Sequence, residues 1–236
     1  MASGMAAGRH GLTTGMTTVG FIGSGSIGST IARLAVEAGY DVVLSNSRGP
    51  ETLADLVAEL GPKARAGTAA QAAAEGDLVV VSVPFHAYRA VPAEPLAGKP
   101  VLDTNNYYPQ RDGHVAALDD GSTTSSELLQ QHLGSAKVVK VFNNILYTHL
   151  ASLARPAGAA DRSALPIAGD DPQAKAAVSA FLDAIGYDAV DAGPLADGGR
   201  RFQPDTPAYG APYGPFRQRQ GQPAGVAELR AALDAA

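Results

Sequence analysis

The residues with the clearest chemical meaning form a glycine-rich stretch near the start of the chain. An apolar run, Thr18–Ile22, leads into Gly23-Ser24-Gly25-Ser26-Ile27-Gly28, and a segment with helical apolar spacing follows. A Gly-x-Gly-x-x-Gly turn between a strand and a helix is typical of dinucleotide-binding proteins. The helix start offers free N–H groups and a positive dipole end to phosphates. We therefore expect a dinucleotide site, with a glycine-rich turn that binds nothing as the alternative.

Specificity for the dinucleotide should be encoded after the second strand, which we expect at 41–45. An NAD site normally has an acidic residue about 20 residues after the glycines, where it accepts hydrogen bonds from the ribose 2′-hydroxyl. This chain has Asn46, Ser47 and Arg48 there instead. Arginine donates several coplanar N–H groups and suits a phosphate. The sequence thus predicts NADP, and the alternative is an arginine that only faces solvent.

Further candidates follow later strands, because ligands of open α/β sheets bind beyond the carboxyl ends of the strands. Val83, Pro84 and Phe85 predict an apolar wall for the cofactor. Asn105 could bind a carboxamide or a ribose hydroxyl, although its surroundings also suit a turn. Asn143 could orient a hydride acceptor, and His86 could donate to a substrate carbonyl or bind phosphate, unless it is an ordinary surface histidine. The chain lacks the Tyr-x-x-x-Lys helix of many reductases, which favours direct hydride transfer.

Composition excludes several classes of protein. The chain has 236 residues, is 45% hydrophobic and 17% charged, and carries a formal net charge of −5, which indicates a soluble α/β protein and gives no reason to expect nucleic acid. The absence of cysteine excludes disulfides and cysteine-ligated metals, and no histidine pair has zinc-binding spacing. No apolar run approaches the roughly 20 residues of a membrane span. Without a recognisable signal peptide, we expect a cytoplasmic protein that has no metal, nucleic-acid or membrane partner.

Alternating strands and helices predict a doubly wound, mainly parallel Rossmann-type sheet over 16–192. The strands are expected near 18–23, 41–45, 64–66, 78–83, 100–103, 137–142, 164–168 and 187–191. Thr124 and Glu127 have capping-box spacing and predict a helix start. Residues 1–15 are expected to be a disordered, dispensable extension.

A different character is expected of 193–236. Residues 193–225 combine proline and glycine with scattered aromatics, which predicts an ordered but irregular arm that leads into a helix at 226–233. The arm could complete the acceptor site, where Arg200, Arg201, Arg217 and Arg219 could meet an anionic acceptor. Equally, it could stabilise a homodimer.

With these stretches in view, the chain resembles the coenzyme F420-dependent NADP oxidoreductases and their dinucleotide-binding relatives. It is also similar, over the same region, to the cytoplasmic domains of transmembrane ferric reductases. The stretches that carry the resemblance are Gly23–Gly28, Ser47-Arg48, Val83-Pro84-Phe85, Lys137–Asn143, Ile167–Asp171 and Asp191–Leu195.

The resemblance implies a role for several of these residues. Ser24 to Ile27 would meet the pyrophosphate, and Ser47 and Arg48 would hold the 2′-phosphate. Phe85 would lie near the nicotinamide half, with Asn143 close to the hydride acceptor.

These observations predict an NADP(H)-dependent oxidoreductase that moves hydride between the nicotinamide and a planar small-molecule acceptor. Coenzyme F420, a deazaflavin, is the favoured co-substrate. The alternatives are an NADPH-binding sensor without turnover and a reductase of a small imine or carbonyl metabolite.

Overall fold

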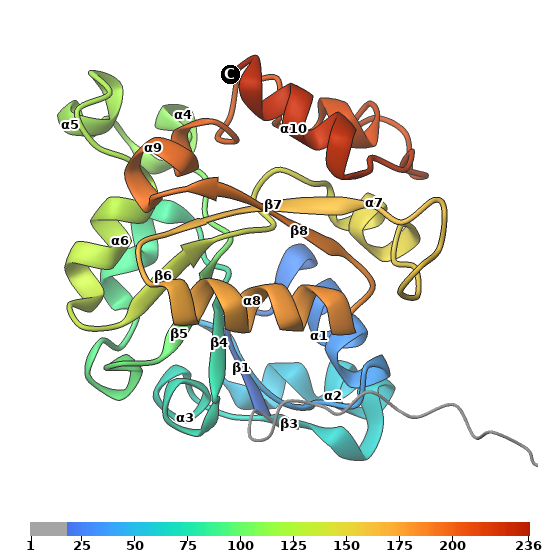
Figure 1. Cartoon of the computed structure of the whole chain (residues 1–236). Coiled ribbons are helices and arrows are strands. Elements are labelled where there is room, and N and C mark those ends of the chain that lie inside the picture. The colour runs from blue at the N-terminus through green and yellow to red at the C-terminus, as the bar shows by residue number, and fades with distance from the viewer. Residues whose placement is uncertain (1–17) are drawn as a thin grey trace, which may run out of the picture.

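Short runs of branched apolar residues build the central sheet, as in the Leu-Val-Val-Val of Leu78–Val81. The computed structural model describes residues 18–236. Its sheet has eight strands in the order β3-β2-β1-β4-β5-β6-β7-β8 (Figure 1). The strands are β1 (Thr18–Ile22), β2 (Asp41–Ser45), β3 (Ala64–Ala66), β4 (Leu78–Val81), β5 (Pro100–Asp103), β6 (Lys137–Lys140), β7 (Ala164–Gly169) and β8 (Asp188–Gly193). Every neighbouring pair is parallel except β6 and β7, so the doubly wound, mainly parallel fold is confirmed.

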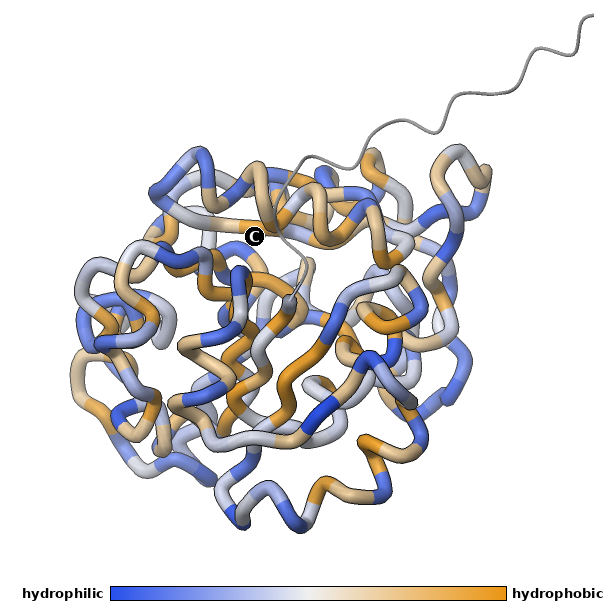
Figure 2. The backbone as a smooth tube through the Cα atoms, turned by 90° about the horizontal axis from the view of Figure 1, so that it is seen from below, coloured by the Kyte–Doolittle hydropathy of each residue, from blue (hydrophilic) through white to orange (hydrophobic). Residues whose placement is uncertain are grey.

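Helices cover both faces of this sheet. They are α1 (Ser26–Glu37), α2 (Ala54–Leu60), α3 (Ala69–Glu75), α4 (Pro109–Asp112), α5 (Ala116–Asp119), α6 (Ser125–Leu133), α7 (Tyr147–Ser152), α8 (Pro172–Ala184), α9 (Leu195–Arg200) and α10 (Val226–Asp234). One apolar core joins the sheet to α1 and α8, and a second joins it to α3 and α6. Figure 2 shows the hydrophobic residues running along the central strands, with hydrophilic residues frequent on the outer segments.

Local signals in the sequence set several element boundaries. The Thr124 side chain accepts a hydrogen bond from the Glu127 N–H, and the Glu127 side chain accepts one from the Thr124 N–H, which confirms the capping box at the start of α6. No element was expected between the strand at 100–103 and the helix start at Thr124, but the structure has two one-turn helices there, α4 and α5. Proline at the first position of α4 explains that helix, because its fixed φ favours a helix start.

The arm, residues 193–225, folds back onto the sheet and contains a short α-helix, α9, and a 3-10 helix, Ala211–Tyr213, that its composition did not predict. Phe202 and Ala208 join Leu229 and Leu233 of α10 in a third apolar core against β7 and β8. Figure 1 shows α10, in red, lying beside these two strands. The buried Tyr213 hydroxyl donates to the carbonyl of Ala164 in β7 at 2.8 Å. The end of the chain is therefore part of the folded core.

The strand order reverses direction between β1 and β4, which are neighbours at the centre of the sheet. Such a switch point leaves a crevice beyond the carboxyl ends of the two strands. Within residues 18–236, no helix has the length and apolar character needed to cross a membrane. The expected extension, 1–15, lies outside the described residues.

Candidate functional site

The glycine-rich turn between β1 and α1 forms the centre of the crevice. Gly23 has a φ of 102°, and a Cβ atom there would lie 2.1 Å from the Ser82 carbonyl oxygen. A Cβ on Gly28 would lie 2.2 Å from the Gly23 carbonyl oxygen, whereas one on Gly25 would meet nothing within 4 Å. Packing therefore demands glycine at 23 and 28, while Gly25 keeps the approach to the helix open. No side chain caps the start of α1, so its N–H groups can bind a ligand.

A hollow of about 530 Å³ lies beside this turn. It is bounded by the turn itself and by the segments that follow β2 and β4. The predicted site residues that line it are Gly23, Ser24, Gly25, Asn46, Ser47, Arg48, Val83, Pro84 and His86. We refer to it as the first hollow.

The segment after β2 is held in shape by the Asn46 side chain. Its Oδ1 accepts hydrogen bonds from the backbone N–H groups of Arg48 and Gly49, both at 3.0 Å. Its Nδ2 donates to the Thr52 hydroxyl at 2.8 Å. This Asx-type turn leaves Ser47 and Arg48 exposed at the rim of the first hollow. Asn46 thus acts on the turn, and the two residues after it face a ligand.

A second hollow of about 320 Å³ adjoins the first and shares Gly25, Ser82, Val83 and Pro84 with it. The ends of β1, β4, β5 and β6 meet here. Tyr209 of the arm completes its wall. The other lining residues are Ser26, Ile27, Thr104, Asn105, Asn106, Tyr108, Arg111, Phe142, Asn143, Ile145, Leu146 and Tyr147.

Amide and hydroxyl groups connect the second hollow to the arm. Asn106 Nδ2 donates to the Asn143 carbonyl at 2.7 Å, and Asn143 Nδ2 donates to the Phe202 carbonyl at 2.8 Å. The hydroxyl groups of Tyr108 and Tyr209 are hydrogen-bonded to each other. Burial, followed by this hydrogen bond, raises the pKa of Tyr209. The arm therefore contributes a protonated hydroxyl group to the wall of this hollow.

Asp112 organises the charged side chains between the two hollows. Burial opposes its ionisation, but hydrogen bonds from Arg111, the Tyr108 N–H and His86 outweigh that effect and lower its pKa to about 2. His86 Nδ1 lies 3.0 Å from Asp112 Oδ1, so the ring donates from Nδ1 and keeps Nε2 for other partners. The Arg111 guanidinium lies 4.9 Å from the centre of the Tyr108 ring. Asp112 thus fixes one imidazole and one cation near the crevice.

A buried polar cluster lies behind the second hollow, formed by Asp103, Ser126 and Lys140, each at most 1% exposed. Lys140 Nζ donates to the Ser126 hydroxyl at 3.1 Å, and that hydroxyl donates to Asp103 Oδ2 at 2.5 Å. Both polar groups of the Asn105 backbone are also held, its N–H by Asp103 Oδ1 at 2.9 Å and its carbonyl by Lys140 Nζ at 3.1 Å. Burial lowers the pKa of Lys140, and the charge of Asp103 opposes that shift.

The structure gathers the predicted site residues around the two hollows, with one correction. Phe85 lines neither of them, because it is 2% exposed and stacks on Tyr88 with ring centres 4.8 Å apart. The strand β4 ends at Val81, and Pro84 leads into a 3-10 helix, Phe85–Ala90, which places the phenylalanine in the apolar core. The expected wall is thus formed by Val83 and Pro84 alone.

Four residues that line or support the second hollow were not predicted from the sequence: Tyr108, Arg111, Tyr209 and Lys140. Only Lys140 left a local signal, a charged residue at the end of an apolar strand.

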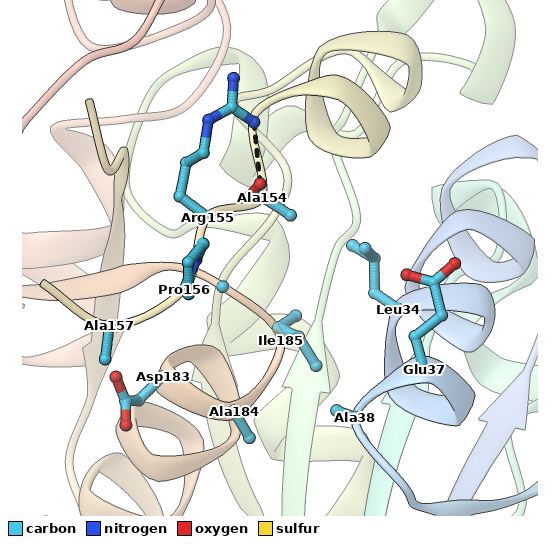
Figure 3. A pocket seen from close by; sticks show the side chains of 11 residues that line it. Leu34, Glu37, Ala38, Ala154, Arg155, Pro156, Ala157, Asp183, Ala184 and Ile185 are labelled. Carbon is cyan, nitrogen blue, oxygen red and sulfur yellow. Dashed lines mark hydrogen bonds between the residues drawn. The ribbon is translucent and has the colours of Figure 1, made fainter. Parts of the chain in front are cut away.

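Another hollow, of about 290 Å³, lies at the opposite end of the strands and is shown in Figure 3. The end of α1, the end of α8 and residues 154–157 surround it. The Arg155 side chain bonds the Ala154 carbonyl beside it at 2.8 Å. The amino ends of the parallel strands face this hollow, whereas ligands of such sheets bind beyond the carboxyl ends. We therefore take the first and second hollows as the candidate functional site.

Comparison with known proteins identifies relatives of this chain. Residues 18–107 match the family model described as NADP oxidoreductase coenzyme F420-dependent. The metalloreductase STEAP3 of Rattus norvegicus is 31% identical over 182 residues, which cover 75% of this chain. The chain spans about a third of that relative, 34% of its length.

Two solved structures resemble the chain over most of its length. A hypothetical protein from Sinorhizobium meliloti has a TM-score of 0.66 at 27% identity and covers 76% of this chain and 86% of its own. A candidate F420-dependent NADP reductase from Arthrobacter sp. FB24 has a TM-score of 0.64 at 28% identity, covering 77% and 86%. Both alignments extend beyond the segment that the family model matches.

Proposed function

Because this chain belongs to the family of coenzyme F420-dependent NADP oxidoreductases, we propose that it transfers hydride between NADP(H) and a planar acceptor, with coenzyme F420 favoured. One observation carries the proposal: the first and second hollows share a wall formed by Gly25, Ser82, Val83 and Pro84. A dinucleotide with its adenine half in the first hollow would extend past this wall into the second. There its nicotinamide would meet an acceptor.

The residues around the first hollow fit NADP. The open space beside Gly25 leaves room for a pyrophosphate at the uncapped start of α1. Exposed Ser47 and Arg48 supply the donors that a 2′-phosphate requires, and Arg48 would bind it through charge-assisted hydrogen bonds. When bound, the reduced cofactor supplies a hydride.

The second hollow suits the acceptor. Tyr108 and Tyr209 present hydroxyl groups, and Arg111 presents a cation near them. Reduction of a carbonyl, an imine or a deazaflavin adds a proton as well as a hydride. Because burial keeps Tyr209 protonated, the tyrosine pair can hold that proton next to an acceptor. His86 would bind a phosphate or carbonyl group nearer the first hollow.

An acceptor screen tests this proposal. NADPH absorbance is followed after addition of oxidised coenzyme F420, small imines or carbonyl compounds. We expect rapid oxidation with F420, weaker or no oxidation with the small compounds, and tighter binding of NADPH than of NADH. Oxidation by imines or carbonyls alone would overturn the assignment of the acceptor. Tight NADPH binding without turnover by any acceptor would instead support the sensor function.

A further inference from the structure

Two asparagine side chains that line the second hollow each hold one unpaired polar atom. Asn105 is 3% exposed and Asn143 is 5% exposed. Within residues 18–236, neither Asn105 Nδ2 nor Asn143 Oδ1 has a hydrogen-bond partner. An unpaired buried polar atom is unfavourable, and such atoms in a folded protein need an explanation. Both residues line the same hollow, which suggests that one ligand satisfies the two atoms together.

Neighbouring hydrogen bonds decide which end of each amide is free. Asn105 Oδ1 accepts from the Val83 N–H at 3.3 Å, so its donor end, Nδ2, is left over. Asn143 Nδ2 donates to Asn106 Oδ1 at 3.1 Å and to the Phe202 carbonyl, so its acceptor end is left over. Turning either amide around would set donor against donor or acceptor against acceptor. The second hollow therefore offers one donor and one acceptor.

A primary carboxamide carries the complementary pair, an accepting C=O and a donating NH₂. We propose that Asn105 Nδ2 donates to the carbonyl of such a group and that Asn143 Oδ1 accepts from its NH₂. Resting on the proposed function, this inference assigns the group to the nicotinamide ring. Both atoms are buried, so each amide must turn slightly about its soft χ2 torsion, with its existing hydrogen bonds kept, to reach such a group.

Asp103, Ser126 and Lys140 are the positioning residues for this contact. They hold the Asn105 backbone from both sides, through its N–H and its carbonyl. A buried lysine and aspartate joined through one hydroxyl are costly to desolvate, and an apolar cluster would fill the same space more cheaply. The charged cluster is explained if the orientation of Asn105 matters for binding. For Asn143, the side chain itself is held, because its Nδ2 donates to Asn106 Oδ1 and to the Phe202 carbonyl, so the arm also fixes one half of the contact.

The first test uses the unaltered protein and three ligands. NADP carries the whole carboxamide, its 3-acetylpyridine analogue has a methyl group in place of the NH₂, and adenosine 2′,5′-bisphosphate lacks the nicotinamide half. Titration calorimetry should show that NADP binds roughly fivefold to a hundredfold more tightly than the analogue, because the analogue leaves Asn143 Oδ1 unpaired. Equal affinities of the two dinucleotides, with normal bisphosphate binding, would overturn this inference alone. Failure to bind the bisphosphate would overturn the proposed function and this inference with it.

Variants then assign each contact. Asn143→Ala should bind NADP and the analogue equally well, whereas Asn105→Ala should weaken both and keep their ratio. Neither change should alter bisphosphate affinity more than about twofold. Lys140→Met should weaken NADP binding in the way that Asn105→Ala does. Lys137→Met, a change of the same kind at the half-exposed start of the same strand, should have no effect.

Thermal melting shows whether each variant is folded. An unchanged NADP affinity in folded Asn105→Ala would contradict the donor contact. If a variant fails to fold, the comparison of the two dinucleotides on the unaltered protein still decides the inference.

Discussion

The two hollows are built by different means. Around the first, backbone atoms of neighbouring segments make the contacts. Gly28 packs on the Gly23 carbonyl, and Asn46 accepts hydrogen bonds from the N–H groups of Arg48 and Gly49. Around the second, side chains meet across long stretches of chain, since Asn143 reaches Phe202 59 residues away and Asn106 reaches Tyr209 103 residues away. Backbone packing thus shapes the end proposed for the cofactor, and side-chain contacts between distant segments assemble the end proposed for the acceptor.

The largest effect is expected where the first hollow meets the core. Gly23→Ala would force a Cβ atom against the Ser82 carbonyl at a φ that alanine avoids. Strain and overpacking together should lower the free energy of unfolding by roughly 2–6 kcal/mol. Denaturant unfolding measures it. Gly25→Ala is the matched control, since its Cβ meets no protein atom: it should keep stability and lose NADP affinity. Equal stability of the two variants would contradict steric control of the turn.

Next in size is the expected effect of removing Arg48 from the rim of the first hollow. Charge-assisted hydrogen bonds to a phosphate are worth about 1.5–3 kcal/mol, so Arg48→Ala should weaken NADPH binding roughly 10- to 150-fold. NADH lacks the 2′-phosphate, and its affinity should hardly change. Dissociation constants for both cofactors provide the measurement. If the unaltered protein bound NADH as tightly as NADPH, the assignment of this rim would fail.

A smaller, more selective effect is expected at the second hollow. Tyr209→Phe removes the hydroxyl that meets Tyr108 and Asn106, one neutral hydrogen-bonding group worth about 0.5–1.5 kcal/mol. Hydride transfer to an accepted substrate should slow roughly 2- to 13-fold, while NADPH affinity stays within twofold. Tyr40→Phe, a hydroxyl deletion on a tyrosine that packs against Phe181, controls for general effects. A loss of NADPH affinity in Tyr209→Phe would show that the two ends of the site are not separable.

The smallest effect should appear only in acid. Folding lowers the pKa of Asp112 from 3.8 to about 2, so its ionised form stabilises the fold above the unfolded pKa. That contribution is lost as the pH falls from about 4 through about 2. Asp112→Asn should therefore lose less stability over this range than the unaltered protein, as followed by thermal unfolding. Asp197→Asn, at an exposed aspartate, should leave the acid limb of the curve unchanged. Parallel curves for all three proteins would argue against ionised Asp112 as the organiser of His86 and Arg111.

The arm shows where reasoning from composition reached its limit. Proline and scattered aromatics indicated an ordered segment, and the buried Phe202 and Tyr213 explain why it is ordered. The composition of the arm did not indicate which surface these side chains cover. Of the four arginines considered for an anionic acceptor, Arg200 bonds the Gly121 carbonyl and Arg201 bonds Asp234. It is an uncharged residue, Tyr209, that reaches the second hollow.

The sequence by itself determined the sheet, its strand boundaries to within a few residues, and the turn that would hold a dinucleotide. These features depend on periodicity, glycine geometry and caps, which act over a few residues and leave local patterns. Only the tertiary structure decided that Phe85 turns into the core, that Asp103, Ser126 and Lys140 meet behind Asn105, and that Tyr209 meets Tyr108. Those contacts join distant segments through single side chains, and no local pattern encodes them because each exists only once the sheet has closed its core around the residues.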